Sequence, residues 1–277
     1  MRVLFLLMLL LASPLWPWGD QGHRVVVSTL ALGGLPPDLR AWYAGCEAEV
    51  EDHASDPDHW KQDRKEGPRH FFDMEPYGEP DHLPRTLEEA RERIGGDYYR
   101  LGVLPWVIQD RWWDLVEAFR SGDPARVAFA TAILGHYIAD AHVPLHTTVN
   151  HDGQLTDQQG IHSRWETGLV GRFIQPGDLE AAPARADTTF PERPWDWLRA
   201  SHALVPRLLE DDREADRTTP VGTHGKRRTQ AYWMIFQARQ GPVVKQQLQR
   251  AGQHLGDAIL NAWIAAGRPP APAKPSN

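Results

Sequence analysis

The sequence contains a single cysteine, Cys46, among its 277 residues. One cysteine cannot form a disulfide within the chain, and it cannot build a thiolate metal site. Any metal ion that this chain binds must therefore be held by nitrogen and oxygen atoms. Such donors are plentiful, because the sequence has 13 histidines and 37 acidic residues.

An excess of positive charge is also lacking, since 37 acidic residues outnumber 30 Lys and Arg and the formal net charge at pH 7 is −7. A protein that coats duplex nucleic acid through a basic surface carries the opposite sign, so tight, salt-sensitive duplex binding is not expected. Bound metal ions could still supply the local positive charge that attracts a phosphodiester.

Long apolar runs are missing after the first residues of the chain, so no later segment is expected to cross a membrane. Met1 and Arg2 precede a short apolar run over residues 3–12, a pattern typical of a secretory signal peptide. An uncleaved anchor is the alternative. We expect residues 1–17 to be removed and the protein to be exported, to the periplasm or the medium.

The alternation of apolar and polar residues that marks a strand is absent as well. Helical spacing dominates, so we predict an all-α fold with one domain over residues 18–267 and a disordered, Pro-rich tail over 268–277. A long ordered loop is expected over 47–81, where Asp, His, Pro and Gly are frequent, and a polar loop over 150–160. Helices are predicted over residues 20–32, 88–101, 105–120, 124–142, 162–173, 195–209, 229–239 and 244–265.

Two pairs of histidine and carboxylate carry the strongest functional signal. His136 and Asp140 are four residues apart, and so are His162 and Glu166. Residues with this spacing project from one face of a helix, one turn apart. Imidazole and carboxylate groups that converge suit zinc, a borderline cation without redox chemistry. The sequence therefore predicts several metal ions held between helices.

Further short motifs with possible metal ligands surround these two pairs, and with them the chain resembles a known family. They are Trp18 followed by His23, Asp56 ahead of His70-Phe71-Phe72-Asp73, and His146 after Asp140. With them the chain resembles the trinuclear zinc superfamily of fungal single-strand nucleases, mung-bean-type plant nucleases and bacterial zinc-dependent phospholipases C. The elements run in the family's order over more than half of the expected mature chain.

The resemblance implies three zinc ions, with Asp140 bridging two of them. Their ligands would be Asp56, His70, His136 and Asp140 for the first ion; the amine and carbonyl of Trp18 with His23 and Asp140 for the second; and His146, His162 and Glu166 for the third.

Two points of this ligand set are open from the sequence. Asp58 and His59 compete with Asp56 for the same role. The main-chain amine requires cleavage between Pro17 and Trp18, although signal peptidase prefers small residues before its cleavage site. His142 and His151 flank the site without matching a ligand position, and we expect them to support the ligands or to face solvent.

The implied chemistry is hydrolysis of a phosphoester. A solvent molecule that bridges two zinc ions loses its proton near neutral pH and can attack phosphorus in line. The third ion can stabilise the departing oxygen, and Asp56 could orient or deprotonate the attacking water. No covalent intermediate is required.

Three functions are compatible with the sequence. In the nuclease branch of the family an aromatic residue after the zinc histidine stacks on a base and an aspartate bonds its edge, and Phe71 and Asp73 stand at these positions. A phospholipase C, or another phosphoester hydrolase, is the alternative. Glu166 favours it, whereas Pro57 and Gly67 replace the aromatic residues of a choline pocket. A non-catalytic zinc-binding protein is the third possibility. We expect a nuclease acting on single-stranded DNA or RNA and on 3′-nucleotides, without a protein partner.

Overall fold

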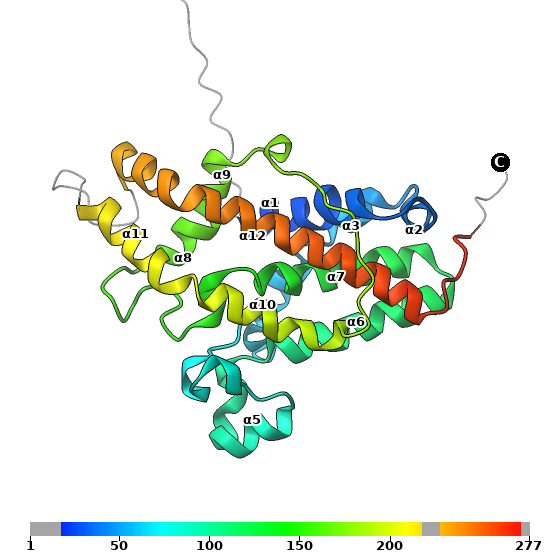
Figure 1. Cartoon of the computed structure of the whole chain (residues 1–277), viewed down its shortest axis with the longest axis horizontal. Coiled ribbons are helices and arrows are strands. Elements are labelled where there is room, and N and C mark those ends of the chain that lie inside the picture. The colour runs from blue at the N-terminus through cyan, green and yellow to red at the C-terminus, as the bar shows by residue number, and fades with distance from the viewer. Residues whose placement is uncertain (1–17, 218–227, 273–277) are drawn as a thin grey trace, which may run out of the picture.

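The computed structural model of the protein describes residues 18–217 and 228–272. The predicted signal peptide, residues 1–17, lies outside the described residues, as does the end of the predicted tail, residues 273–277. Every regular element of the described residues is a helix or a helical turn, so the all-α prediction is confirmed. Figure 1 shows these helices as one bundle, with α5 and its neighbouring turns projecting below its long side.

The first part of the chain consists of short helices. The predicted helix over 20–32 is α1 (Trp18–Val25), which continues as a π-helix, η1 (Val26–Ala31). The segment 47–81 is ordered as expected, but it is not a plain loop. It contains several helical pieces, too short and too rich in Pro and Gly to give a periodic pattern. Before this segment come η2 (Leu32–Gly34), α2 (Pro37–Arg40) and η3 (Ala41–Tyr43), and after it comes α5 (Leu87–Ile94). The pieces that begin within the segment are α3 (Glu47–Asp52), α4 (Asp56–His59) and the 3-10 turns η4 (Trp60–Gln62), η5 (Gly67–His70), η6 (Glu75–Tyr77) and η7 (Pro80–His82).

A helical hairpin forms the centre of the bundle. Helix α6 (Leu104–Ser121) ends at Gly122, which adopts the left-handed conformation with φ of 74°. Helix α7 (Pro124–Asp140) begins directly after it, and the carboxylate of Asp123 accepts hydrogen bonds from the amides of Ala125 and Arg126. The sequence predicts both helices, because the cap and the following proline are plain signals.

The second half of the bundle departs from the prediction twice. The predicted helix over 195–209 is broken into α10 (Arg193–His202) and α11 (Val205–Arg217). The break falls just before Pro206, which lacks the amide needed to continue a helix. In contrast, the two helices predicted over 229–239 and 244–265 are one helix, α12 (Gln230–Ala265), with Pro242 inside it.

Helix α12 tolerates its proline because it is packed along its whole length. It contacts η1, α6, α7 and α11, and Figure 1 shows it crossing the molecule in front of α7. The burial of one continuous apolar face outweighs the loss of about 3 kcal/mol for a proline inside a helix. Local sequence therefore predicted a break that the tertiary packing overrides.

The remaining helical segment carries the second histidine–carboxylate pair. It runs through α8 (Ile161–Ser163), a π-helix, η10 (Arg164–Leu169), and α9 (Val170–Phe173).

The beginning of the predicted tail is held against the fold. The carbonyl of Pro269 accepts hydrogen bonds from the indoles of Trp42, at 3.1 Å, and Trp263, at 2.8 Å.

A membrane-spanning helix is not found among the described helices, none of which combines the length and apolarity that a bilayer requires.

The closest approach of α12 to the N-terminal helices gives a test of this packing. A Cβ at Gly252 would overlap the Cβ of Leu30, whereas a Cβ at Gly256 would come no nearer than 3.5 Å to any atom. We expect Gly252→Ala to lower the free energy of unfolding by about 1–3 kcal/mol through overpacking. Gly256→Ala, one turn away, is the matched control and should be neutral or stabilising by up to about 1 kcal/mol. Urea unfolding of both variants measures the difference, and equal effects would contradict the packing.

Candidate metal centre

The buried centre of the site lies on the last two turns of α7. His136 and Asp140 project from one face of this helix, and His70, at the end of η5, meets them from the other side. The Nδ1 atom of His70 lies 2.9 Å from Oδ2 of Asp140 and 3.1 Å from Nε2 of His136. His136 Nε2 is 3.4 Å from the same carboxylate oxygen. All three side chains are buried, so these donors converge on one point away from solvent.

Backbone carbonyls fix the orientation of two of the histidines. Nδ1 of His136 donates to the carbonyl of Ala54 at 2.9 Å, and Nδ1 of His146 donates to the carbonyl of His70 at 2.6 Å. In each ring the other nitrogen, Nε2, is then left unprotonated and faces the cluster. Hydrogen bonds of this kind are the usual support of metal-ligating histidines.

A second group of donors is formed by His146, His162 and Glu166. His146 belongs to the η9 turn (Pro144–Thr147). Its Nε2 atom lies 3.0 Å from Nε2 of His162, which in turn lies 2.7 Å from Oε2 of Glu166. The spacing of four residues places His162 and Glu166 together, as predicted.

A buried arginine anchors the helix that carries this second group. Arg164, between the two donors in sequence, is only 8% exposed. Its Nε and Nη2 atoms each donate to the carboxylate of Asp212 at 3.0 Å, and Nε also donates to the hydroxyl of Tyr232. A two-pronged, charge-assisted pair of this kind fixes orientation as well as distance. It ties the donor helix to α11 and α12.

His23 joins the cluster from α1. Its ring stacks on that of His136 with 4.0 Å between centroids, and its Nε2 atom lies 3.7 Å from Oδ1 of Asp140. Its Nδ1 atom is buried and has no hydrogen-bond partner among the described residues. A buried imidazole with an unpartnered nitrogen, which approaches the carboxylate of Asp140 through its Nε2 atom, suits the role of a metal ligand.

Asp140 connects the groups. Its Oδ2 faces His70 and His136, while its Oδ1 lies 3.7 Å from His23 and 3.6 Å from Nδ1 of His146. Burial by itself would raise the pKa of this carboxyl. The surrounding histidines, His136 and His146 foremost, outweigh that effect and hold the pKa well below its usual range. The carboxylate is therefore ionised at neutral pH.

His136, which lies beside Asp140, is uncharged where that carboxylate is ionised. Burial, with a smaller contribution from His23, lowers the pKa of His136 to about 3. At neutral pH the ring is uncharged, with a free lone pair. Neutral imidazole and ionised carboxylate are the protonation states that a divalent cation requires, so the donor set fits zinc.

The structure differs from the predicted ligand set at Asp56. The Oδ2 atom of Asp56 is paired with Nδ1 of His53 at 2.7 Å. Asp58, in contrast, places Oδ1 3.8 Å from Nε2 of His136 and 3.9 Å from Nδ1 of His70. Residues two apart on a helix face nearly opposite directions, so the short helix α4 can present only one of the two carboxylates to the cluster.

The groups of potential ligands within the described residues include Asp58 and neither Asp56 nor His59. Trp18 is the first residue of α1, five residues before His23. The cluster thus brings together most of the predicted ligands. These are His23, His70, His136, Asp140, His146, His162 and Glu166.

Phe71 and Asp73 lie beside the cluster in a cavity of about 370 Å³. The exposed ring of His151 lines the same cavity, together with His70 and His146. Burial and the nearby carboxylate of Glu75 raise the pKa of Asp73 to about 7. An aromatic ring and a carboxyl that exchanges its proton near neutrality therefore stand next to the candidate metal centre.

Glu66 is a supporting residue that the sequence analysis missed. It is 4% exposed, and its carboxylate accepts hydrogen bonds from Tyr137 at 2.5 Å and from Arg69 at 3.1 Å. Its Oε1 atom lies 3.4 Å from Nε2 of His70, on the side of the ring away from Asp140. The signal was available, because Glu66 precedes His70 by four residues, the same spacing that marks the other two pairs.

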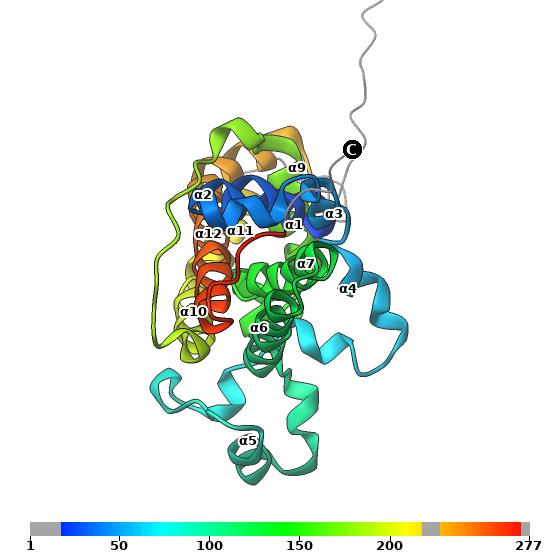
Figure 2. The ribbon, with the colours of Figure 1, turned by 90° about the vertical axis from the view of Figure 1, so that its right-hand side faces the viewer.

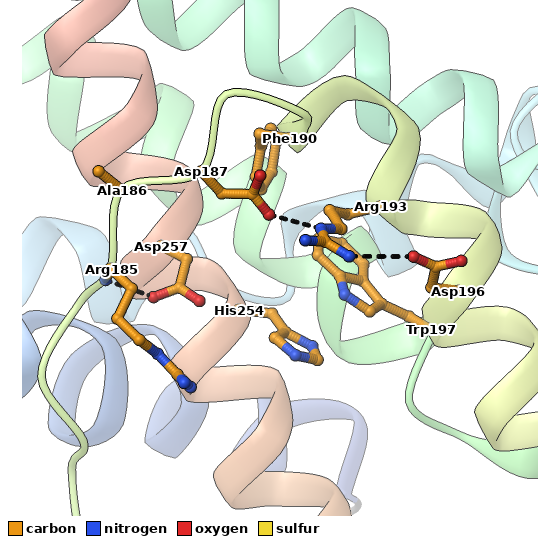
Figure 3. A pocket seen from close by; sticks show the side chains of 9 residues that line it. All are labelled: Arg185, Ala186, Asp187, Phe190, Arg193, Asp196, Trp197, His254 and Asp257. Atoms are coloured by element: carbon orange, nitrogen blue, oxygen red, sulfur yellow. Dashed lines mark hydrogen bonds and ion pairs between the residues drawn. The ribbon is translucent and has the colours of Figure 1, made fainter.

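His142 lies behind the cluster and contributes no donor to it. It is buried; its Nδ1 donates to the carbonyl of Ile138, and its Nε2 lies 2.7 Å from Nδ1 of His254. His254 stacks on Trp197 and lines a separate cavity of about 510 Å³. Figure 3 shows this cavity, where the guanidinium of Arg193 donates hydrogen bonds to the carboxylates of Asp187 and Asp196.

The fold and the cluster define a helical protein with an interior set of imidazole and carboxylate donors, and a comparison with known families agrees. The sequence model of the S1/P1 Nuclease family matches residues 18–265, and the chain belongs to this family. No curated protein matches the chain. Membership confirms the predicted family resemblance. It supports a nuclease-type hydrolase of phosphodiester bonds, with nucleic acid rather than phospholipid as the substrate class.

The raised pKa of Asp73 gives a prediction with a definite sign. Its folded-state pKa of about 7 lies above the usual value of 3.8, so ionisation destabilises the fold as the pH rises from about 4 to 7. Asp73→Asn removes this penalty. We expect the variant to be more stable than the parent at pH 8, by about 1–4 kcal/mol, and the difference to vanish near pH 4. Urea unfolding of metal-free protein at both pH values measures it, and a difference independent of pH would contradict the assignment.

Proposed function

We propose that the protein is a zinc-dependent phosphodiesterase that cleaves single-stranded DNA and RNA and hydrolyses 3′-nucleotides. The observation that carries the proposal is the position of Asp140, whose two oxygens face separate groups of histidines. One carboxylate shared in this way can hold two ions close together, and such a pair of ions is suited to displacement at phosphorus.

Three ions are proposed, with one change from the ligand set that the sequence implied. Asp58 replaces Asp56, because only Asp58 lies near His70 and His136. The ligands would be Asp58, His70, His136 and Asp140 for the first ion; the amine and carbonyl of Trp18 with His23 and Asp140 for the second; and His146, His162 and Glu166 for the third.

Zinc bound there would supply an acidic water molecule and positive charge for the phosphate oxygens. The chain's own residues would do the rest. Asp58 would orient the attacking water and accept its proton, in place of Asp56, which is engaged with His53. Phe71 would stack on a base, and Asp73, which can both donate and accept a hydrogen bond near neutral pH, would contact its edge.

Export is part of the proposal. Removal of residues 1–17 would free the amine of Trp18 at the start of α1, on the same helix as His23. The second ion would then depend on correct processing, which ties metal binding to passage through the export machinery.

The two aspartates of α4 offer a matched pair of variants for the ligand assignment. We expect Asp58→Asn to lose bound zinc and to lower kcat/KM at least 100-fold, because a direct ligand and proton acceptor is removed. Asp56→Asn, two residues away, should keep its zinc and most of its activity. Metal analysis and initial-rate assays of both variants decide the matter, and the reverse order would return the role to Asp56.

A parallel assay tests the function itself. Zinc-replete protein is incubated with single-stranded DNA, RNA, a 3′-nucleotide and phosphatidylcholine. We expect hydrolysis of the first three, and loss of this activity in His136→Ala and Asp140→Asn together with a drop in zinc content. Cleavage of the lipid alone would establish a phospholipase. Tightly bound zinc without hydrolysis of any substrate would indicate a binding protein.

A further inference from the structure

A groove outside the metal centre has no assigned role. It has a volume of about 480 Å³ and lies between helices α6 and α7 and the η4 turn (Trp60–Gln62). Figure 2 shows α4, which leads into this turn, beside α7, with α6 below. We refer to it as the α6–α7 groove and define it by the lining residues Trp60, Arg111, Asp114, Glu117, Arg126 and Phe129.

Two aromatic rings of the groove are open to solvent. Trp60 is 38% exposed and Phe129 is 42% exposed, unlike the fully buried Trp42, Trp165 and Trp195 of the core. Phe129 is held in place by the ring of His53, which packs against it edge-on with 5.1 Å between centroids. Asp56 in turn holds His53. Large apolar rings that remain exposed inside a hollow indicate a binding surface.

The charged residues that line the groove are two arginines and two carboxylates. Asp114 is paired with Arg111 at 3.0 Å, and Glu117 is paired with Arg120, so both carboxylates are already engaged. Arg126 makes no ion pair within the described part of the chain. The Nε atom of Arg111 is buried and lacks a hydrogen-bond partner among the described residues. Because Asp114 neutralises Arg111, Arg126 is the guanidinium of the lining whose charge can attract an anion.

The groove lies near the metal centre along two elements, and it shares no lining residue with the cavity beside the cluster. Phe129, Ile133 and His136 follow one another on the same face of α7, and the distance along the helix from Phe129 to His136 is about 10 Å. On the other side, Trp60 follows Asp58 by two residues, and the carboxylate of Asp58 is 3.8 Å from His136.

We infer that the α6–α7 groove binds a base and an adjoining phosphate of a single-stranded nucleic acid whose cleaved phosphate lies at the metal centre. Trp60 and Phe129 stack on the base, and Arg126 attracts the phosphate. This inference rests on the proposed function and extends it. It makes the protein prefer strands of several nucleotides over a dinucleotide, which is too short to occupy both places.

The test compares two substrates on the zinc-replete protein: a single-stranded oligothymidylate of about ten nucleotides and the thymidine dinucleotide. We expect Trp60→Ala and Phe129→Ala each to lower the ratio of kcat/KM for the longer strand to that for the dinucleotide by about 5- to 100-fold, through KM. Trp113→Ala is the matched control, since this tryptophan on α6 is 50% exposed but does not line the groove.

The charge contribution has its own readout. Arg126→Gln should reduce the slope of log KM against log salt for the longer strand by about 0.7, the value for one phosphate contact on a single strand. Thermal unfolding followed by circular dichroism confirms that each variant is folded. An unchanged ratio in both aromatic variants, or an equal fall in Trp113→Ala, overturns the inference.

Failure of the inference can be told apart from failure of the proposed function. If the unaltered protein cleaves neither substrate, the proposed function fails, and fluorescence anisotropy with the same labelled oligothymidylate then decides on the groove. Binding that is lost in Trp60→Ala supports it, and no binding overturns it. A Trp60→Ala variant that changes the sedimentation of the protein from dimer to monomer also overturns it, because a second copy would then occupy the groove.

Discussion

The interaction on which the site depends is the contact of one buried carboxylate, Asp140, with four imidazoles. An isolated charge in the interior is costly, and here the cost is offset only by the partners that surround it. Helix α7 carries both Asp140 and His136, while His23, His70 and His146 come from separate parts of the chain. The cluster therefore holds α1, η5, η9 and α7 together, and a bound cation would add to that cohesion.

The helical nature of the protein could be read from its sequence, because the caps and apolar spacing of α6 and α7 agree with their packing. The continuity of α12 could not. Pro242 is a strong local signal, and only the contacts with η1, α7 and α11 show why it is overridden. The short helices between residues 47 and 81 were missed for the opposite reason, since pieces this small are set by their surroundings.

The candidate site was predictable to the extent that its residues follow a helical spacing. His162 and Glu166 meet because they are one turn apart, and so do His136 and Asp140. The choice between Asp56 and Asp58 was beyond the sequence. Both belong to one short helix, and the rotation of that helix about its axis decides which carboxylate faces His136. Glu66 was overlooked although its spacing from His70 repeats the pattern.

The two π-helical stretches, Val26–Ala31 and Arg164–Leu169, have a consequence for how the fold accepts change. A π-helix accommodates one more residue than an α-helix of the same extent. Deleting one residue within η10 would leave an α-helix of the same extent, so Arg164 and α9 on its two sides could keep their directions. The same deletion within an α-helix would turn everything beyond it by about 100°. These two segments are therefore the places in their helices where a change of length by one residue is most easily absorbed.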